Sequence, residues 1–460
     1  MSVRTFVPNW VDLRELWRLA MPVAVVQLAT LLMGAVDTAM VGRVSAAHLG
    51  AVGLGNIYFF CVSLFGIGLL MGFDPVLSQA VGAEDQPAIA RAVQRGLILS
   101  AVTAAVASVL HAVSEPVFTF LQQPDSIIPL AAGYAEGLIP GMFPFFAFML
   151  IRLFLQAVGD VRPVVVVVLA ANVANFVLNW MLIFGNWGAP ELGAVGSAYG
   201  TSICRWIMLL GLCALIWRRL GPAILRPRRA ALSLRALGRV MRVGVPVGLH
   251  FGLEYGVFAA AGLMVGLFGE TAFAGHQITI QLASFTFMLP MGIAQATAVL
   301  VGRSVGARDP RGARRAAGAG LTAGGAAMAV CAAAFVLFPA PLARLFSPEV
   351  AVVSAAVALV PVAGFFQIVD GIQVVGAGAL RGLADTTLPM LAVLVSFWVV
   401  GVPVSWAMGF PLGFGPVGIW WGLAAGLGVA SVLLLVRLRI RFARPARRVV
   451  IDASDDQGPG

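Results

Sequence analysis

Apolar stretches about 20 residues long recur from one end of this chain to the other. A helix needs about 20 apolar residues to cross a bilayer core about 30 Å thick. Hydrophobic residues make up 60% of the chain and charged residues 11%, whereas an ordinary soluble domain carries roughly 25% charged residues. The sequence therefore predicts an all-α integral membrane protein.

We count twelve such stretches and expect twelve transmembrane helices. Their approximate limits are residues 16–40, 51–72, 94–113, 130–156, 163–184, 194–217, 240–266, 274–302, 317–338, 352–376, 387–409 and 416–436. The first stretch lacks the small-residue cleavage site of a signal peptide, so we expect it to be retained as a helix.

The basic residues indicate the orientation in the membrane. All 30 are arginines, and if the N-terminus is cytoplasmic, 27 of them lie before or near the start of the first span, in or near every second connection, or after the last span. Arg43 and Arg344 are exceptions, and Arg205 is interpreted as the one intramembrane cation. This positive-inside pattern predicts a multi-pass protein of the inner (plasma) membrane with both termini cytoplasmic. It also explains the net charge of +10 without nucleic acid as a partner.

The chain repeats itself with an offset of about 224 residues. Pro22 corresponds to Pro246, Gly68 to Gly292, and VGAED at 81–85 to VGARD at 305–309. Six helices return the chain to its starting side, so the two halves share one orientation. Two parallel repeats of this kind are typical of a rocking transporter. The predicted domains are a first lobe at 1–217, an Arg-rich cytoplasmic linker at 218–239, a second lobe at 240–442 and a disordered cytoplasmic tail at 443–460.

Three carboxylates lie inside predicted spans, namely Asp37, Glu254 and Asp370. A charge there costs about 2.5 to 3.5 kcal/mol on insertion scales, so such residues mark a functional site by default. Low dielectric disfavours the charged form, so a buried acid can alternate between holding a proton and holding a cation. That exchange is the minimum chemistry of antiport. The structural alternative is that each acid forms a fixed salt bridge. Arg205 could be the partner of only one of the three acids, so the others would need a different partner.

Polar side chains accompany Asp37 in the first half. Asn175 and Asn179 are four residues apart and share a helix face, and Thr201 lies in the next span. Together with Asp37 they form a candidate site for a small hard cation such as Na⁺. Asparagine pairs also hold membrane helices together, so both interpretations of the two amides stay open.

Several segments together resemble the multidrug and toxic compound extrusion (MATE) family over nearly the whole chain. They are AMP at 20–22, VGR at 41–43, GFDPVLSQAVGAED at 72–85, the segment at 274–307, and ALRGLADTTLP at 379–389. The resemblance implies twelve helices in two V-shaped lobes that act as a monomer. It implies efflux of small organic cations by alternating access, driven by inward H⁺ or Na⁺, with no other cofactor.

The resemblance also implies roles for individual residues. Asp37, Asn175, Asn179 and Thr201 match the family's first-lobe cation site, and Glu254 and Asp370 match the acidic pair of the NorM branch. Phe366 replaces a family tyrosine one turn before Asp370, which argues against direct Na⁺ coordination in the second lobe. The residues expected to bind substrate are Asp37, Glu254, Gln277, Phe366 and Asp370.

Other functions are less consistent with the sequence. A lipid or lipid-linked oligosaccharide flippase of related architecture is the main alternative, although phosphate-bearing cargo favours a basic cavity and the charges within these spans are mainly acidic. The major facilitator plan also has two six-helix halves, but the connection between the second and third spans lacks the expected basic cluster. An enzyme is not expected, since the HExxH motif is absent.

Overall fold

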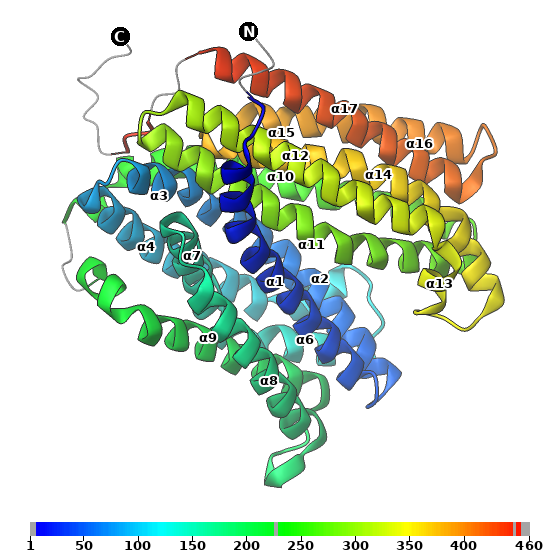
Figure 1. Ribbon diagram of the computed structural model, residues 1–460. Coiled ribbons are helices and arrows are strands. Elements are labelled where there is room, and N and C mark those ends of the chain that lie inside the picture. Colours follow the sequence, from blue (N-terminus) through cyan, green and yellow to red (C-terminus); the bar gives the residue numbers. More distant parts are fainter. Residues whose placement is uncertain (1–5, 225–228, 445–447, 452–460) are drawn as a thin grey trace. The chain divides into compact units, whose positions relative to one another are not determined.

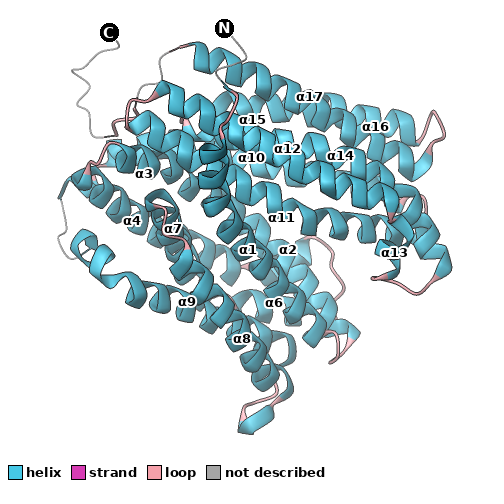
Figure 2. Ribbon diagram, viewed as in Figure 1, coloured by secondary structure: helices cyan, strands magenta, loops and turns pink. Residues whose placement is uncertain are grey.

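The computed structural model describes residues 6–224, 229–444 and 448–451, which form helices joined by short connections (Figure 1). These residues contain no strand (Figure 2). Backbone polar groups find no water inside a bilayer, and a helix satisfies them within one segment. The predicted all-helical class is confirmed.

Twelve helical segments of the described chain are long and apolar enough to span a membrane, as predicted. They are α1 (Trp10–Val41), α2 with α3 (Ala46–Met71, Phe73–Gly82), α4 (Gln86–Ala112), α6 with α7 (Ile128–Gly137, Met142–Val158), α8 (Arg162–Phe184), α9 (Gly193–Ile224), α10 (Leu234–Gly266), α11 (Glu270–Gly306), α12 (Pro310–Leu337), α14 (Val350–Gly382), α15 through the π-helix η5 to α16 (Thr387–Leu394, Val395–Gly401, Val402–Gly409) and α17 (Gly415–Ala443). Short elements lie between them: α5 (Ser114–Phe120), α13 (Pro339–Arg344) and the 3-10 turns η2 (Ile139–Gly141), η3 (Asn186–Gly188) and η4 (Arg229–Leu232). Most spans extend past their predicted limits, because helices continue into polar residues that hydropathy leaves out.

The repeated motif VGAED/VGARD forms the same turn twice. Glu84 and Arg308 both have left-handed backbone conformations, with φ of 54° and 57°. The next residue caps the following helix in each half: Asp85 accepts a hydrogen bond from the backbone N–H of Ala88 and Asp309 from that of Gly312, both at 2.9 Å. A short acidic side chain at this position satisfies a backbone donor that the first helical turn leaves free. The equivalent residues therefore have equivalent structures.

The helices pack into two units that exchange short segments. The first-half unit contains Val25–Leu77 and Asp85–Gly248, and the second-half unit contains Leu249–Val450 together with Met1–Ala24 and Ser78–Glu84. Thus α1 and α10 each pass from one unit to the other, α1 after Ala24 and α10 after Gly248. Each has a proline two residues earlier, which removes one intrahelical hydrogen bond where the helix changes unit.

This exchange follows the sequence repeat. Within the first-half unit, a Cβ atom on Gly68 would overlap the backbone of Gly248. Within the second-half unit, a Cβ atom on Gly292 would overlap Ala24. The offset of 224 residues relates Gly68 to Gly292 and Ala24 to Gly248, so the two contacts are equivalent. Small residues permit this close helix packing.

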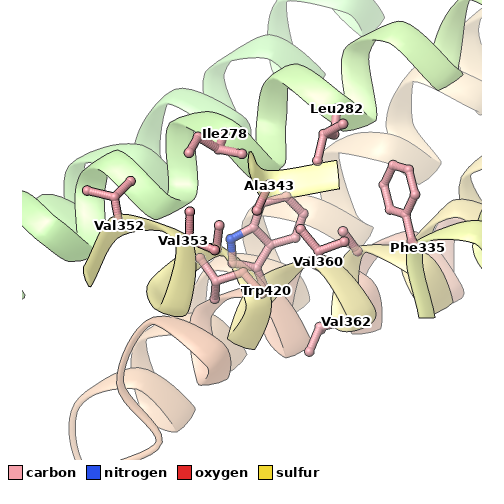
Figure 3. Packing of buried hydrophobic residues seen from close by; sticks show 12 residues of the cluster. Ile278, Leu282, Phe335, Ala343, Val352, Val353, Val360, Val362 and Trp420 are labelled. Atoms are coloured by element: carbon pink, nitrogen blue, oxygen red, sulfur yellow. The ribbon is translucent and has the colours of Figure 1, made fainter. Parts of the chain in front are cut away.

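Helix α14 is the centre of the second-half unit, where it contacts α11, α12 and α17. A Cβ atom on Gly378 or Gly382 would overlap the backbone of α11, so glycine is required for this approach. An apolar cluster of α11, α14 and α17 surrounds the buried indole of Trp420 (Figure 3). Helix α14, which carries Asp370, is therefore closely packed against its neighbours.

The predicted division of the chain into lobes at 1–217 and 240–442 remains a prediction. The predicted linker at 218–239 includes residues 225–228, and the predicted tail at 443–460 includes residues 445–447 and 452–460, which lie outside the described residues.

Candidate functional site

Asp37 lies within the membrane-spanning helix α1 and is 5% exposed. The amide nitrogen of Asn179 donates a hydrogen bond to its Oδ1, and the hydroxyl of Thr201 donates one to its Oδ2 at 3.2 Å. The described chain contains no ion pair to Asp37. The predicted first-half group is therefore assembled from α1, α8 and α9, and its acid is held by neutral donors.

The two asparagines on α8 are joined to each other as well. The Nδ2 atom of Asn179 lies 3.3 Å from Oδ1 of Asn175, as expected for side chains four residues apart on one face. The remaining amide atoms, Oδ1 of Asn179 and Nδ2 of Asn175, are buried without a partner in the described chain. A half-turn of the Asn179 amide exchanges its donor for its acceptor. The same group can therefore donate to an ionised Asp37 or offer oxygen to a small cation beside it.

We expect Gly200→Ala to disturb this group. A Cβ atom on Gly200 would lie 2.8 Å from Oδ1 of Asn179, so the amide that donates to Asp37 must shift. Losing a hydrogen bond to a charged group costs roughly 1.5 to 3 kcal/mol, so ion-driven uptake should fall by roughly tenfold or more. The measurement is the initial rate in vesicles. Gly211→Ala, on the same helix with its nearest neighbour at 3.7 Å, is the control, and equal rates for both variants would contradict this role of Asn179.

The second half brings two acids near each other. Glu254 on α10 is 9% exposed and Asp370 on α14 is 4% exposed, and the two interact electrostatically. The Nε2 atom of His250 lies 3.8 Å from Oε2 of Glu254. Asp370 has no hydrogen bond or ion pair within the described residues. Two carboxylates that repel each other favour a cation near them.

Two other predicted residues occupy different surroundings. Phe366 is 3% exposed and packs edge-on against Phe258 and Trp420, with ring centroids 5.9 and 5.8 Å apart. Gln277 lies on an exposed part of α11, and no described contact joins it to Glu254 or Asp370. The structure thus places Phe366 in the packed core beside Asp370, and it does not bring Gln277 into the acidic pair.

The interpretation of Arg205 as the one intramembrane cation is wrong. Arg95, Arg152 and Arg381 also lie in membrane-spanning helices. Arg152, for example, donates a hydrogen bond to Oε1 of Gln27 at 2.8 Å. Arg95 and Arg152 fall within the predicted spans 94–113 and 130–156, and Arg381 lies in α14 because that helix extends past its predicted limit at residue 376. The run FFAFMLIRLFLQAV at 145–158, in which Arg152 is surrounded by apolar residues, could have predicted its place within a span.

Twelve spans, an internal repeat and buried acids in both halves define a polytopic membrane transporter. The family profile MatE matches residues 22–181 and again residues 246–407, once in each half. The chain therefore belongs to the MATE family of membrane transporters, and its relatives are NorM-like. The double match confirms the repeat predicted from the sequence.

Curated relatives match almost the whole chain. The multidrug resistance protein NorM of Burkholderia vietnamiensis is 37% identical over 432 residues, covering 92% of this chain and 93% of the relative. The probable multidrug resistance protein NorM of Rhizobium meliloti is 36% identical, covering 94% and 93%. NorM of Vibrio cholerae is 34% identical, covering 92% and 94%.

Solved structures share the fold. The crystal structure of the eukaryotic MATE transporter AtDTX14 matches with a TM-score of 0.84 at 20% identity, covering 95% of this chain and 98% of that one. An outward-facing multidrug resistance MATE transporter matches with a TM-score of 0.84 at 19% identity, covering 94% and 96%. At this level of identity the similarity concerns the fold alone.

Proposed function

We propose that this transporter exports small organic cations in exchange for inward H⁺ or Na⁺ by alternating access. The observation that carries the proposal is the environment of Asp37, which is buried, hydrogen-bonded to neutral groups and not ion-paired in the described chain. A carboxylate held in this way is available to exchange one cation for another. Relatives named as multidrug resistance proteins support a drug-like substrate.

The proposed exchange uses both halves. Asp37, with Asn175, Asn179 and Thr201, holds the coupling ion, Na⁺ being the metal that this oxygen set suits. Glu254 on α10 and Asp370 on α14 attract the organic cation or the ion in the second half. Phe366 supports Asp370 by packing, and Gln277 meets substrate only in another arrangement of the helices. The transporter needs no cofactor besides the coupling ion.

Orientation follows from the arginines. With both termini cytoplasmic in the inner (plasma) membrane, most of the 30 arginines lie at or beyond the cytoplasmic ends of the spans, as the positive-inside rule requires. The ion then enters from outside and the substrate leaves from the cytoplasm or inner leaflet. We propose a monomer as the functional unit.

The energy comes from the ion gradient. One-for-one exchange of H⁺ or Na⁺ for a monovalent organic cation moves no net charge, so the ion's concentration gradient is the driving force. A tenfold gradient supplies about 1.4 kcal/mol. This is enough for a tenfold accumulation of the substrate.

The experiment is ethidium transport in proteoliposomes with the membrane potential clamped at zero. We expect ethidium to be transported in the direction opposite to the downhill flow of H⁺ or Na⁺. This transport should stop when the imposed gradient is collapsed. Separate pH and Na⁺ arms identify the coupling ion. Ethidium movement that ignores both gradients would overturn the antiport proposal.

A further inference from the structure

Arg205 is a buried cation on α9, one turn beyond Thr201, and the proposed exchange does not use it. Its side chain is 7% exposed. The guanidinium carbon lies 4.4 Å from the ring centroid of Phe59 on α2 and 4.9 Å from that of Phe145 on α7. The side-chain stem runs along Gly141, where a Cβ atom would come within 3.0 Å of Cδ. Two phenyl rings and a glycine therefore hold this arginine in place.

Arg205 is not locked to an acid. It interacts electrostatically with Asp37, but no nitrogen-to-oxygen distance within 4.0 Å joins them in the described chain. Its Nη1 atom is buried without a hydrogen-bond partner there. The other titratable groups that interact with it electrostatically are Tyr134, Cys204 and His111. The rings, and not an acid, hold Arg205 in position, and a guanidinium stays protonated in proteins.

This arrangement fixes the charge balance of the first-half site. With an ionised Asp37 the pair is neutral, a bound monovalent cation gives a net charge of +1, and a divalent organic cation gives +2. Without Arg205 the same states would carry −1, 0 and +1. In low dielectric the repulsion from Arg205 acts on each charge of the ligand, so a dication is opposed twice as strongly as a monocation.

We propose that Arg205 is a specificity-determining residue that restricts the Asp37 site to one positive charge at a time and so discriminates against dicationic substrates. The proposal rests on the proposed function, in that Asp37 receives cations. Two unit charges beyond ion-pair distance at an effective dielectric of about 20 alter binding by roughly tenfold per ligand charge. The discrimination between a monocation and a dication is therefore roughly tenfold.

Ethidium and propidium test this directly, because they share one ring system and carry one and two positive charges. Their dissociation constants are measured by fluorescence with the full-length protein in lipid nanodiscs. We expect Arg205→Met and Arg205→Gln to lower the ratio of the propidium to the ethidium dissociation constant roughly tenfold relative to wild type. Arg205→Lys keeps the charge and should keep the ratio.

Each other outcome has a defined meaning. If both neutral variants are monodisperse and change the two affinities equally, Arg205 is a packing residue and the inference is overturned. The same conclusion holds if neither neutral variant folds. If wild-type protein binds neither dye, the proposed function fails instead, and if Asp37→Asn leaves ethidium binding unchanged, Asp37 is not the receiving site.

Discussion

Asp37→Asn is expected to abolish ion-driven uptake while leaving the protein folded. Asparagine has nearly the same shape, its oxygen can still accept the hydrogen bond from Asn179, and its NH₂ group can donate to the hydroxyl of Thr201, but it carries no charge to attract a cation. A unit charge at about 4 Å is worth about 4 kcal/mol at an effective dielectric of about 20. Its loss lowers cation affinity by roughly a thousandfold. The measurement is the initial rate of gradient-driven ethidium uptake in proteoliposomes.

Asp125→Asn is the matched control, since Asp125 is an exposed acid outside the membrane-spanning helices. It should transport at the wild-type rate. Near-normal uptake by Asp37→Asn under either gradient would show that the first-half carboxylate plays no part in coupling.

The second large effect is expected from Glu254→Gln and Asp370→Asn combined. The two carboxylates interact and attract the same cation, so each single variant keeps part of that attraction and should lose roughly tenfold in affinity. The double variant keeps neither charge and should lose at least about a hundredfold. Titration of ethidium binding in nanodiscs measures all three.

Glu270→Gln is the control for this pair, because Glu270 is an exposed acid in the first turn of α11. It removes one negative charge from the same half and should leave affinity unchanged. A double variant that binds ethidium as tightly as wild type would remove the second-half acids from the mechanism.

The sequence predicted the helices and the first-half group well, for a clear reason. Hydrophobic length marks a membrane span directly, and a spacing of four residues puts Asn175 and Asn179 on one helix face. A polar face cannot point at lipid, so Asp37 and Thr201 had to meet it. The structure confirms these contacts, and the transport roles of the residues remain predictions.

Other features depend on which helices become neighbours, and periodicity does not carry that information. Phe59 and Phe145 are ordinary apolar residues until α2 and α7 bring their rings together against Arg205. Phe366 was expected to meet substrate from its correspondence to a family tyrosine, yet aromatic neighbours from α10 and α17 enclose it. The exchange of segments between the units is likewise invisible in hydropathy, although Pro22 and Pro246 mark its positions.

The reciprocal contacts of Gly68 with Gly248 and of Gly292 with Ala24 bear on how such a chain arose. A protein consisting of one such half could not complete these contacts alone, because the N-terminal turns of its first helix would have to pack against a second copy. We therefore expect that severing the modern chain between α9 and α10 would give two fragments, each of which needs the N-terminal turns of the other in order to pack.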